Sequence, residues 1–264
     1  MIRRVFRQMS TTQIISAMTF NICLLVDSAV VGRLLGVEAM SASGLTRPLL
    51  IIFFSLATTI SCGIQVVCGK ALGMGDREQM NQCYSTSVVM ALVVAGAGIV
   101  LVFTATQPIC ALLGAGRPGA DNPVFAMTGD YLRGFFLGAP FYFLSQITIP
   151  YLQIMGKRRL LLVSVAAMTV ADVVMDLLSV FVFHAGMFGI GLASSLSYLS
   201  AIAVSTFYFL SKGCPFRFCW KSVQRSMAIG IGKTGSTAIF NQMMYTIRIY
   251  CFNQINTFPI CRTI

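Results

Sequence analysis

The chain has 264 residues, of which 56% are hydrophobic and only 10% are charged, and its mean hydropathy is +0.81. A soluble domain usually carries about 25% charged residues, so this composition excludes an ordinary soluble protein and indicates a membrane protein. The formal net charge of +11 does not indicate a nucleic-acid partner, because the basic residues lie in short loops between apolar runs.

Seven apolar runs follow one another, and none shows the alternation typical of strands, so we predict helices throughout. The predicted ranges are 9–32, 48–72, 82–106, 125–153, 160–183, 189–210 and 227–256. Gly36 breaks the chain after the first run, and Pro48 begins the second, where its missing N–H costs little. The fourth run contains Gly138 and Pro140, which predicts a kink near Pro140.

These runs predict an all-α integral membrane fold in three parts. Residues 1–210 form a six-helix transmembrane bundle. Residues 211–226 form a basic linker that contains Trp220 and fits an amphipathic segment lying on the membrane surface. Residues 227–264 supply a seventh helix, which begins a second and incomplete unit.

The charge of the loops predicts the orientation. One set of helix ends holds the basic residues Arg3, Arg4, Arg7, Lys70, Arg77, Lys157, Arg158, Arg159, Lys212, Arg217, Lys221 and Arg225. The other set holds only Arg33, Arg47 and Arg117, with Arg133 at a helix start. Because basic loops stay in the cytoplasm, we predict a multi-pass protein of the cell membrane with a cytoplasmic N-terminus.

Three carboxylates lie inside the apolar runs. Asp172 and Asp176 share one face of the fifth predicted helix, and Asp27 lies in the first. A carboxylate near the bilayer centre costs about 2.5–3.5 kcal/mol, and like charges oppose each other's ionisation. The three cannot all stay ionised in a low-dielectric cavity, so we predict that they bind a proton, or Na⁺ through oxygen ligands.

Other interpretations of the acids stay open. Asp172 and Asp176 could pair with Arg248 of the seventh run, and Asp27 could lie at the outer interface. The nine Cys residues and single His have no zinc-type spacing, so no cofactor is predicted beyond the coupling ion. The sequence contains no nucleophile–base pair and no phosphate-binding loop, which argues against an enzyme.

Four segments follow one another along the predicted helices: 27–36 (DSAVVGRLLG), 71–77 (ALGMGDR), 151–157 (YLQIMGK), and 172–176 (DVVMD) with the glycine-rich 186–193. Together they resemble the multidrug and toxic compound extrusion (MATE) family of transporters. The resemblance implies the first of the family's two six-helix lobes. The stretch IGIGKTG is similar to the start of helix 7, so we expect a truncated copy, or part of a longer protein whose second lobe is missing.

The resemblance also implies a proton or cation site between helices 1, 5 and 6. It assigns Asp27 and Asp176 to the family's acids and places Ser194 near a family hydroxyl on helix 6. Asp172 stands where the family commonly has Asn, which makes this site more acidic. Loading the site is expected to bend or repack helix 1 and expel a bound organic cation.

The implied function is an H⁺- or Na⁺-coupled antiporter that exports organic cations and drugs through a cavity lined by Met, Phe and Tyr. Tyr142, Gln146 and Gln153 are the predicted cavity residues. Tyr131, Tyr142 and Tyr151 also fit interface anchors. The alternatives are a lipid-linked saccharide flippase of the same superfamily, whose anionic substrate needs a cationic cavity, and a membrane fragment that does not transport.

Overall fold

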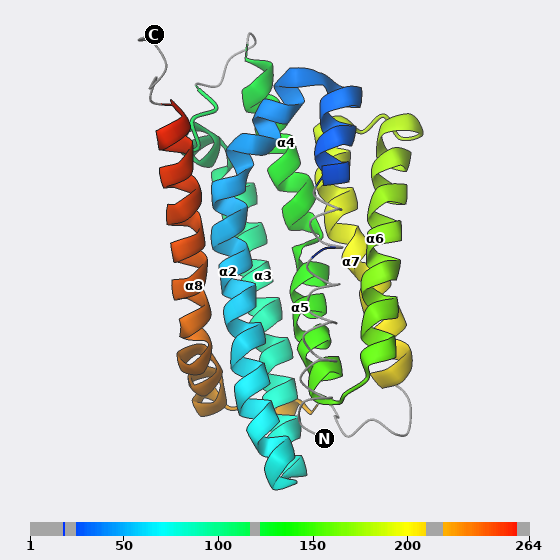
Figure 1. Cartoon of the computed structure of the whole chain (residues 1–264), viewed down its shortest axis with the longest axis vertical. Helices are drawn as coiled ribbons and strands as arrows, with labels where there is room; N and C mark the ends of the chain where they lie inside the picture. Colours follow the sequence, from blue (N-terminus) through cyan, green and yellow to red (C-terminus); the bar gives the residue numbers. More distant parts are fainter. Residues whose placement is uncertain (1–17, 19–24, 117–121, 210–218, 258–264) are drawn as a thin grey trace, which may run out of the picture.

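The computed structural model describes residues 18, 25–116, 122–209 and 219–257, so most of the first predicted helix lies outside this part of the chain. Within it every regular element is a helix, and the long helices stand side by side in a bundle (Figure 1). In chain order they are η1 (Val31–Leu35), α2 (Gly36–Met74), α3 (Arg77–Leu112), α4 (Pro123–Leu137), α5 (Ala139–Ile154), α6 (Arg158–Phe181), α7 (Gly186–Phe209), η2 (Trp220–Ser222) and α8 (Arg225–Thr257). The predicted all-α fold is confirmed.

The second predicted helix begins earlier than its sequence suggests. Gly36 has φ of 89°, a left-handed conformation that favours glycine, and it ends η1 as the predicted break requires. α2 starts there, however, and Pro48 lies inside the helix, where it removes a single backbone hydrogen bond without ending the helix. Figure 1 shows the first turns of α2 slanting across the upper end of the bundle before the helix runs down through it.

α3 also continues beyond its predicted end, as far as Leu112. Pro108 within it has no N–H to donate to the carbonyl of Thr104, and its ring crowds that carbonyl. The backbone accommodates the proline at Ala105, where φ is −118° and ψ is 27°. The predicted range ends at 106, two residues before Pro108, whereas in the structure the helix continues through the proline with a kink.

The fourth predicted helix consists of α4 and α5, which meet at an angle of 50°. Gly138 lies between them, and Pro140 occupies the first turn of α5, where a proline is tolerated. The predicted kink near Pro140 is confirmed. Gly138 also lies against the Ser195 side chain of α7, too close for a Cβ at this position. α7 therefore packs on α4 and α5 at the bend between them.

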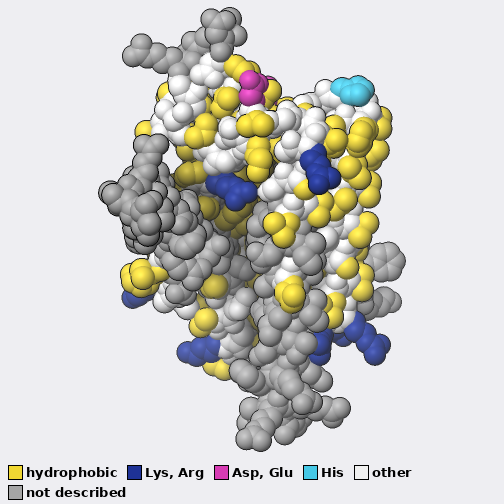
Figure 2. All heavy atoms as spheres, turned by 45° about the horizontal axis from the view of Figure 1, so that its top comes forward, with side chains coloured by type: hydrophobic (Ala, Val, Ile, Leu, Met, Phe, Trp, Pro, Cys, Tyr) yellow, Lys and Arg dark blue, Asp and Glu magenta, His cyan; other side chains and the backbone are white. Residues whose placement is uncertain are grey.

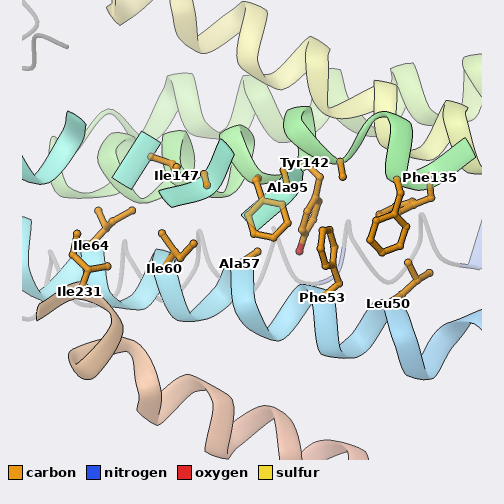
Figure 3. Packing of buried hydrophobic residues seen from close by; sticks show 14 of the residues in the cluster. Leu50, Phe53, Ala57, Ile60, Ile64, Ala95, Phe135, Tyr142, Ile147 and Ile231 are labelled. Atoms are coloured by element: carbon orange, nitrogen blue, oxygen red, sulfur yellow. The ribbon is translucent and has the colours of Figure 1, made fainter. Parts of the chain in front are cut away.

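An aromatic core joins α2 to α4 and α5 (Figure 3). One face of α2 carries the apolar residues Leu50, Phe53, Ala57, Ile60 and Ile64. The Phe53 ring packs against Phe136 and Phe143, with ring centroids 4.5 and 4.8 Å apart. Aromatic pairs at such distances contribute beyond their buried area, so this cluster fixes how α2 lies against the bent pair.

Glycines let α7 approach both α4 and α6. Gly191 lies against the carbonyl oxygen of Tyr131 on α4, too close for a Cβ. On the other side of α7, Gly189 lies equally close to the Ser179 hydroxyl of α6. Small residues bring membrane helices together in this way, and α7 therefore sets the spacing between α4 and α6.

Among the described residues, four helical stretches are long and apolar enough to cross a membrane, and the bent pair of α4 and α5 makes a fifth. The four are Leu25–Met74, Arg77–Leu112, Arg158–Phe181 and Gly186–Thr206. α8 is long enough but too polar to be among them, although it packs along α2, where Gly235 lies against the Thr59 carbonyl. The predicted count of six complete spans includes the first run, which lies mostly outside the described residues.

The surface of the bundle matches a protein surrounded by lipid. Figure 2 shows apolar side chains over the walls, several Lys and Arg side chains toward the lower end and two more in the upper half. In Figure 1 that end carries the turn between α2 and α3, the turn between α5 and α6, and the start of α8. These are the helix ends that hold the larger set of basic residues in the sequence, and the structure describes a multi-pass membrane bundle.

The contact between α7 and α4 can be tested by replacing Gly191 with Ala. Overpacking costs about 1–3 kcal/mol, and 1 kcal/mol corresponds to roughly 2–4 °C in a domain of this size. We expect the midpoint of thermal unfolding in detergent to fall by several degrees. Gly96→Ala is the matched control, because a Cβ there meets nothing within 4 Å, and it should keep or raise the midpoint. An equal fall in both variants would contradict the close contact.

Candidate functional site

α6 turns polar side chains toward the bundle and apolar side chains outward. Its buried residues are Leu161, Ser164, Asp172, Asp176 and Ser179. Its exposed residues include Val163, Val170, Val174, Leu177 and Phe181. This is the reverse of a helix on the surface of a soluble protein. It is typical of a helix whose outer face contacts lipid and whose inner face carries a function.

The structure brings the three predicted acids together. Asp176 is fully buried and Asp172 is 7% exposed. Asp27 lies in the helical stretch 25–30, and η1, which continues that stretch, packs on α7. The carboxyl group of Asp27 contacts that of Asp176, and the charge of Asp172 acts on both. Two segments more than a hundred residues apart therefore share one acidic centre.

The contact between Asp27 and Asp176 does not have the geometry of a hydrogen bond. Oδ1 of Asp27 and both carboxyl oxygens of Asp176 are buried, and no hydrogen-bond partner reaches them from the described residues. No three acidic, Cys or His side chains in the described ranges are close enough to hold a metal ion together. A buried carboxylate needs a proton or a cation to offset the loss of its hydration, so this pair is suited to take up one of these.

Tyr131 of α4, which the sequence suggested only as an interface anchor, lies within reach of the acids. All three acids act electrostatically on its side chain, and so does Arg47 of α2. The close approach at Gly191 places Tyr131 there. In the sequence a tyrosine inside an apolar run also fits an interface anchor. Only the packing of α4 against α7 shows that Tyr131 lies near the acids instead.

Ser194 is not joined to the acids by any hydrogen bond of the described residues. Its hydroxyl donates to the carbonyl oxygen of Ile190, one turn back in α7, at 3.0 Å. The predicted part of Ser194 in coupling therefore stays a prediction. Arg248 lies in α8, but its side chain is outside the described part of the structure, so the proposed pairing of the acids with Arg248 is untested.

The three predicted cavity residues are spread along α5. Tyr142 is buried among aromatic rings, with centroids 4.9 Å from both Phe54 and Tyr198, and its hydroxyl faces Gln146. Gln153, near the other end of α5, accepts a hydrogen bond from the Gln65 amide of α2 at 3.4 Å. The described contacts do not gather Tyr142 and Gln153 in one place, and their role in substrate binding stays a prediction.

Long apolar helices with a pair of acids buried among them define a multi-pass membrane bundle that carries ionisable groups in its interior. The MatE family model matches residues 13–178. The chain therefore belongs to this family, the MATE transporters, as the sequence resemblance predicted.

Individual relatives agree with the family. The multidrug export protein MepA of Staphylococcus saprophyticus subsp. saprophyticus is 26% identical over 173 residues, which cover 66% of this chain and 37% of that protein. The FAD transporter of Shewanella oneidensis is 24% identical over 217 residues, which cover 80% of this chain and 46% of that protein. The chain thus spans less than half of the length of these curated relatives.

The solved structures show the same fold. The outward-facing conformation of a multidrug resistance MATE family transporter of the MOP superfamily matches with a TM-score of 0.82 and 18% identity, covering 95% of this chain and 55% of that one. Because these relatives are transporters, an enzyme is not supported and the flippase alternative is not favoured.

Replacing Asp176 with Asn tests the burial of its charge. The variant removes a carboxylate that lacks a hydrogen-bond partner, so the thermal midpoint should rise most at alkaline pH, where the acids are ionised. At acid pH, where the wild-type carboxyl is protonated, the gain should be small. The midpoint is measured in detergent across the pH range. Asp130→Asn on the exposed side of α4 is the control and should be nearly neutral. Similar pH dependence in both variants would show that Asp176 is solvated.

Proposed function

We propose that this chain forms the lobe of an antiporter in which H⁺ or Na⁺ uptake drives the export of organic cations and drugs. The observation that carries the proposal is the buried contact between the carboxyl groups of Asp27 and Asp176, which come from two separate helices. No cofactor is proposed beyond the coupling ion. The proposal extends the family membership, since membership alone fixes neither the ion nor the substrate.

Coupling follows from the electrostatics of the centre. A cation or proton bound between Asp27 and Asp176 neutralises charge that the buried site otherwise holds without a partner. Asp172 adds a further negative charge and strengthens the attraction for a cation. A ligand shifts a conformational equilibrium only by its differential affinity for the two states. The site can therefore drive transport if it is enclosed in one state and hydrated in the other.

Two features support cationic and drug-like substrates. Asp172 and Asp176 are the acidic side chains buried within the described part of the bundle, where no Lys or Arg is buried, and they favour a positive substrate over an anionic one. The aromatic cluster around Tyr142 offers rings to an apolar or cationic drug. The relative named as a multidrug export protein agrees with this class. The relative named as an FAD transporter handles a phosphate-bearing molecule, which the acidic centre here would repel.

The proposal includes a partner and an orientation. The chain spans 55% of the length of the solved transporter, so we propose that transport uses a second lobe, supplied by the rest of a longer polypeptide or by another chain. We also propose that the basic end of the bundle faces the cytoplasm of the cell membrane, because basic loops are retained there.

Efflux of a fluorescent cationic dye tests the proposal. Everted membrane vesicles from cells expressing the protein should transport the dye when a pH or Na⁺ gradient is applied. Asp27→Asn and Asp176→Asn should each lose gradient-driven transport, because an amide neither binds a proton nor carries the charge that attracts Na⁺. Asp130→Asn, the exposed control, should keep it. Thermal midpoints of all variants show whether a loss reflects unfolding.

Two outcomes would overturn the proposal. Undiminished gradient-driven efflux in both acid variants would remove Asp27 and Asp176 from the coupling step. Absence of efflux from well-folded wild-type protein would favour the alternative that this chain is a membrane fragment without transport activity.

A further inference from the structure

The short segment that precedes α8 is tied to α3 at both of its ends. The Cys219 backbone N–H donates to Oγ of Ser85 at 3.0 Å, and the Gln224 backbone N–H donates to Oγ1 of Thr86 at 3.3 Å. Ser85 and Thr86 are both buried. We call residues 219–224 the strap. Each of these bonds joins residues more than 130 positions apart in the chain, so the strap has a defined place on the bundle.

The strap presents a large aromatic side chain outward. Between its two attachment points lies η2, which begins at Trp220, and the Trp220 side chain is 74% exposed. Tryptophan is enriched where a membrane meets water, because its ring is apolar while its N–H still needs a polar partner. The exposed Trp220 side chain, on a backbone segment fixed at the end of the bundle, therefore fits the interface between membrane and water.

Several basic side chains lie at the same end of the bundle (Figure 2). Those described are Lys70, Arg77, Lys157, Arg158, Arg159 and Arg225. Two acids lie among them, Asp76 and Glu78, which accept hydrogen bonds from the Gln79 N–H at 3.0 Å and the Gln82 amide at 3.3 Å and so keep their charge, against six basic residues. The end as a whole therefore carries a strong excess of positive charge beside an exposed indole.

We propose that the strap and the surrounding basic residues form a binding surface for the headgroups of anionic phospholipids. Spanning helices α2, α3 and α6 all have an end here, which places the surface at headgroup level when their apolar walls lie in lipid. Long basic side chains reach toward lipid phosphates from such positions, and clusters of them favour anionic over neutral lipid. The strap adds a fixed indole to this charge. An acidic protein could also match the positive charge, but its binding would not require the surface to lie at the level of the lipid headgroups.

Trp220 is the single tryptophan of the chain, so its fluorescence reports on this surface alone. The purified protein is placed in nanodiscs of phosphatidylcholine, with or without phosphatidylglycerol, and brominated acyl chains serve as quencher. We expect phosphatidylglycerol to shift the emission to shorter wavelength and to increase quenching. Raising the salt should reduce the difference, because the Debye length falls from about 30 Å at 0.01 M to about 3 Å at 1 M.

Charge variants separate this surface from the rest of the protein. Arg77→Gln with Arg159→Gln and Arg225→Gln should abolish the response to phosphatidylglycerol. The control, Arg33→Gln with Arg133→Gln, changes exposed arginines outside this end and should leave the response intact. Equal emission in both lipids, or an equal loss in both variants, would overturn the proposal. So would an equal response to soluble polyglutamate in neutral nanodiscs, which would indicate an acidic protein partner.

The part played by the strap has its own variant. Ser85→Ala with Thr86→Val removes both acceptors, and Trp220 emission should then move to longer wavelength and lose its dependence on lipid charge. Thr104→Val is the control, because it removes a hydroxyl from the exposed side of the same helix. Circular dichroism confirms that both proteins are helical. An unchanged lipid response in the Ser85 and Thr86 variant would show that the strap does not position Trp220.

Discussion

The structure depends on placing unpaired carboxyl groups inside an apolar bundle. The buried contact between Asp27 and Asp176 leaves oxygens without a hydrogen-bond partner among the described residues, which is costly in a medium that cannot solvate charge. The polar residues of α6, the two acids among them, face the bundle, and its apolar residues face outward, where lipid is expected. The glycines of α7 then bring Tyr131 of α4 close to the same place. A membrane helix whose inner face is this polar has a function there.

The packing separates a firm part of the bundle from the part that holds the acids. The large core joins α2, α3, α4 and α5 through aromatic rings, and Ile231 of α8 packs on it. A much smaller cluster, built from Val31, Ala39, Ala42, Met187 and Ile190, joins η1 and the start of α2 to α7. Rearrangements occur where few buried apolar contacts must be broken. Asp27 lies beside the small cluster, so the η1 side of the acidic centre is held by few buried apolar contacts, whereas α6 and α7 pack closely on each other.

The sequence predicted what depends on composition and local geometry: the all-α membrane fold, the kink near Pro140 and the pairing of acids from distant runs. It misplaced the start of α2 and the end of α3, because each predicted boundary lies at or next to a proline, and a long helix can contain a proline as a kink. Tyr131 was not recognised as part of the site, since its place depends on how closely α4 and α7 pack. Cavity residues were equally hard to choose, because contacts between helices decide which side chains face each other.

Infrared difference spectroscopy of the purified protein between acid and alkaline pH tests the central claim most directly. The carbonyl stretch of a protonated carboxyl group in a dry environment has its own band, distinct from that of a hydrated acid. If Asp27 and Asp176 share one enclosed site, this band should change with pH in the wild type and should be altered in both Asp27→Asn and Asp176→Asn. A band that either variant leaves unchanged would contradict a shared site.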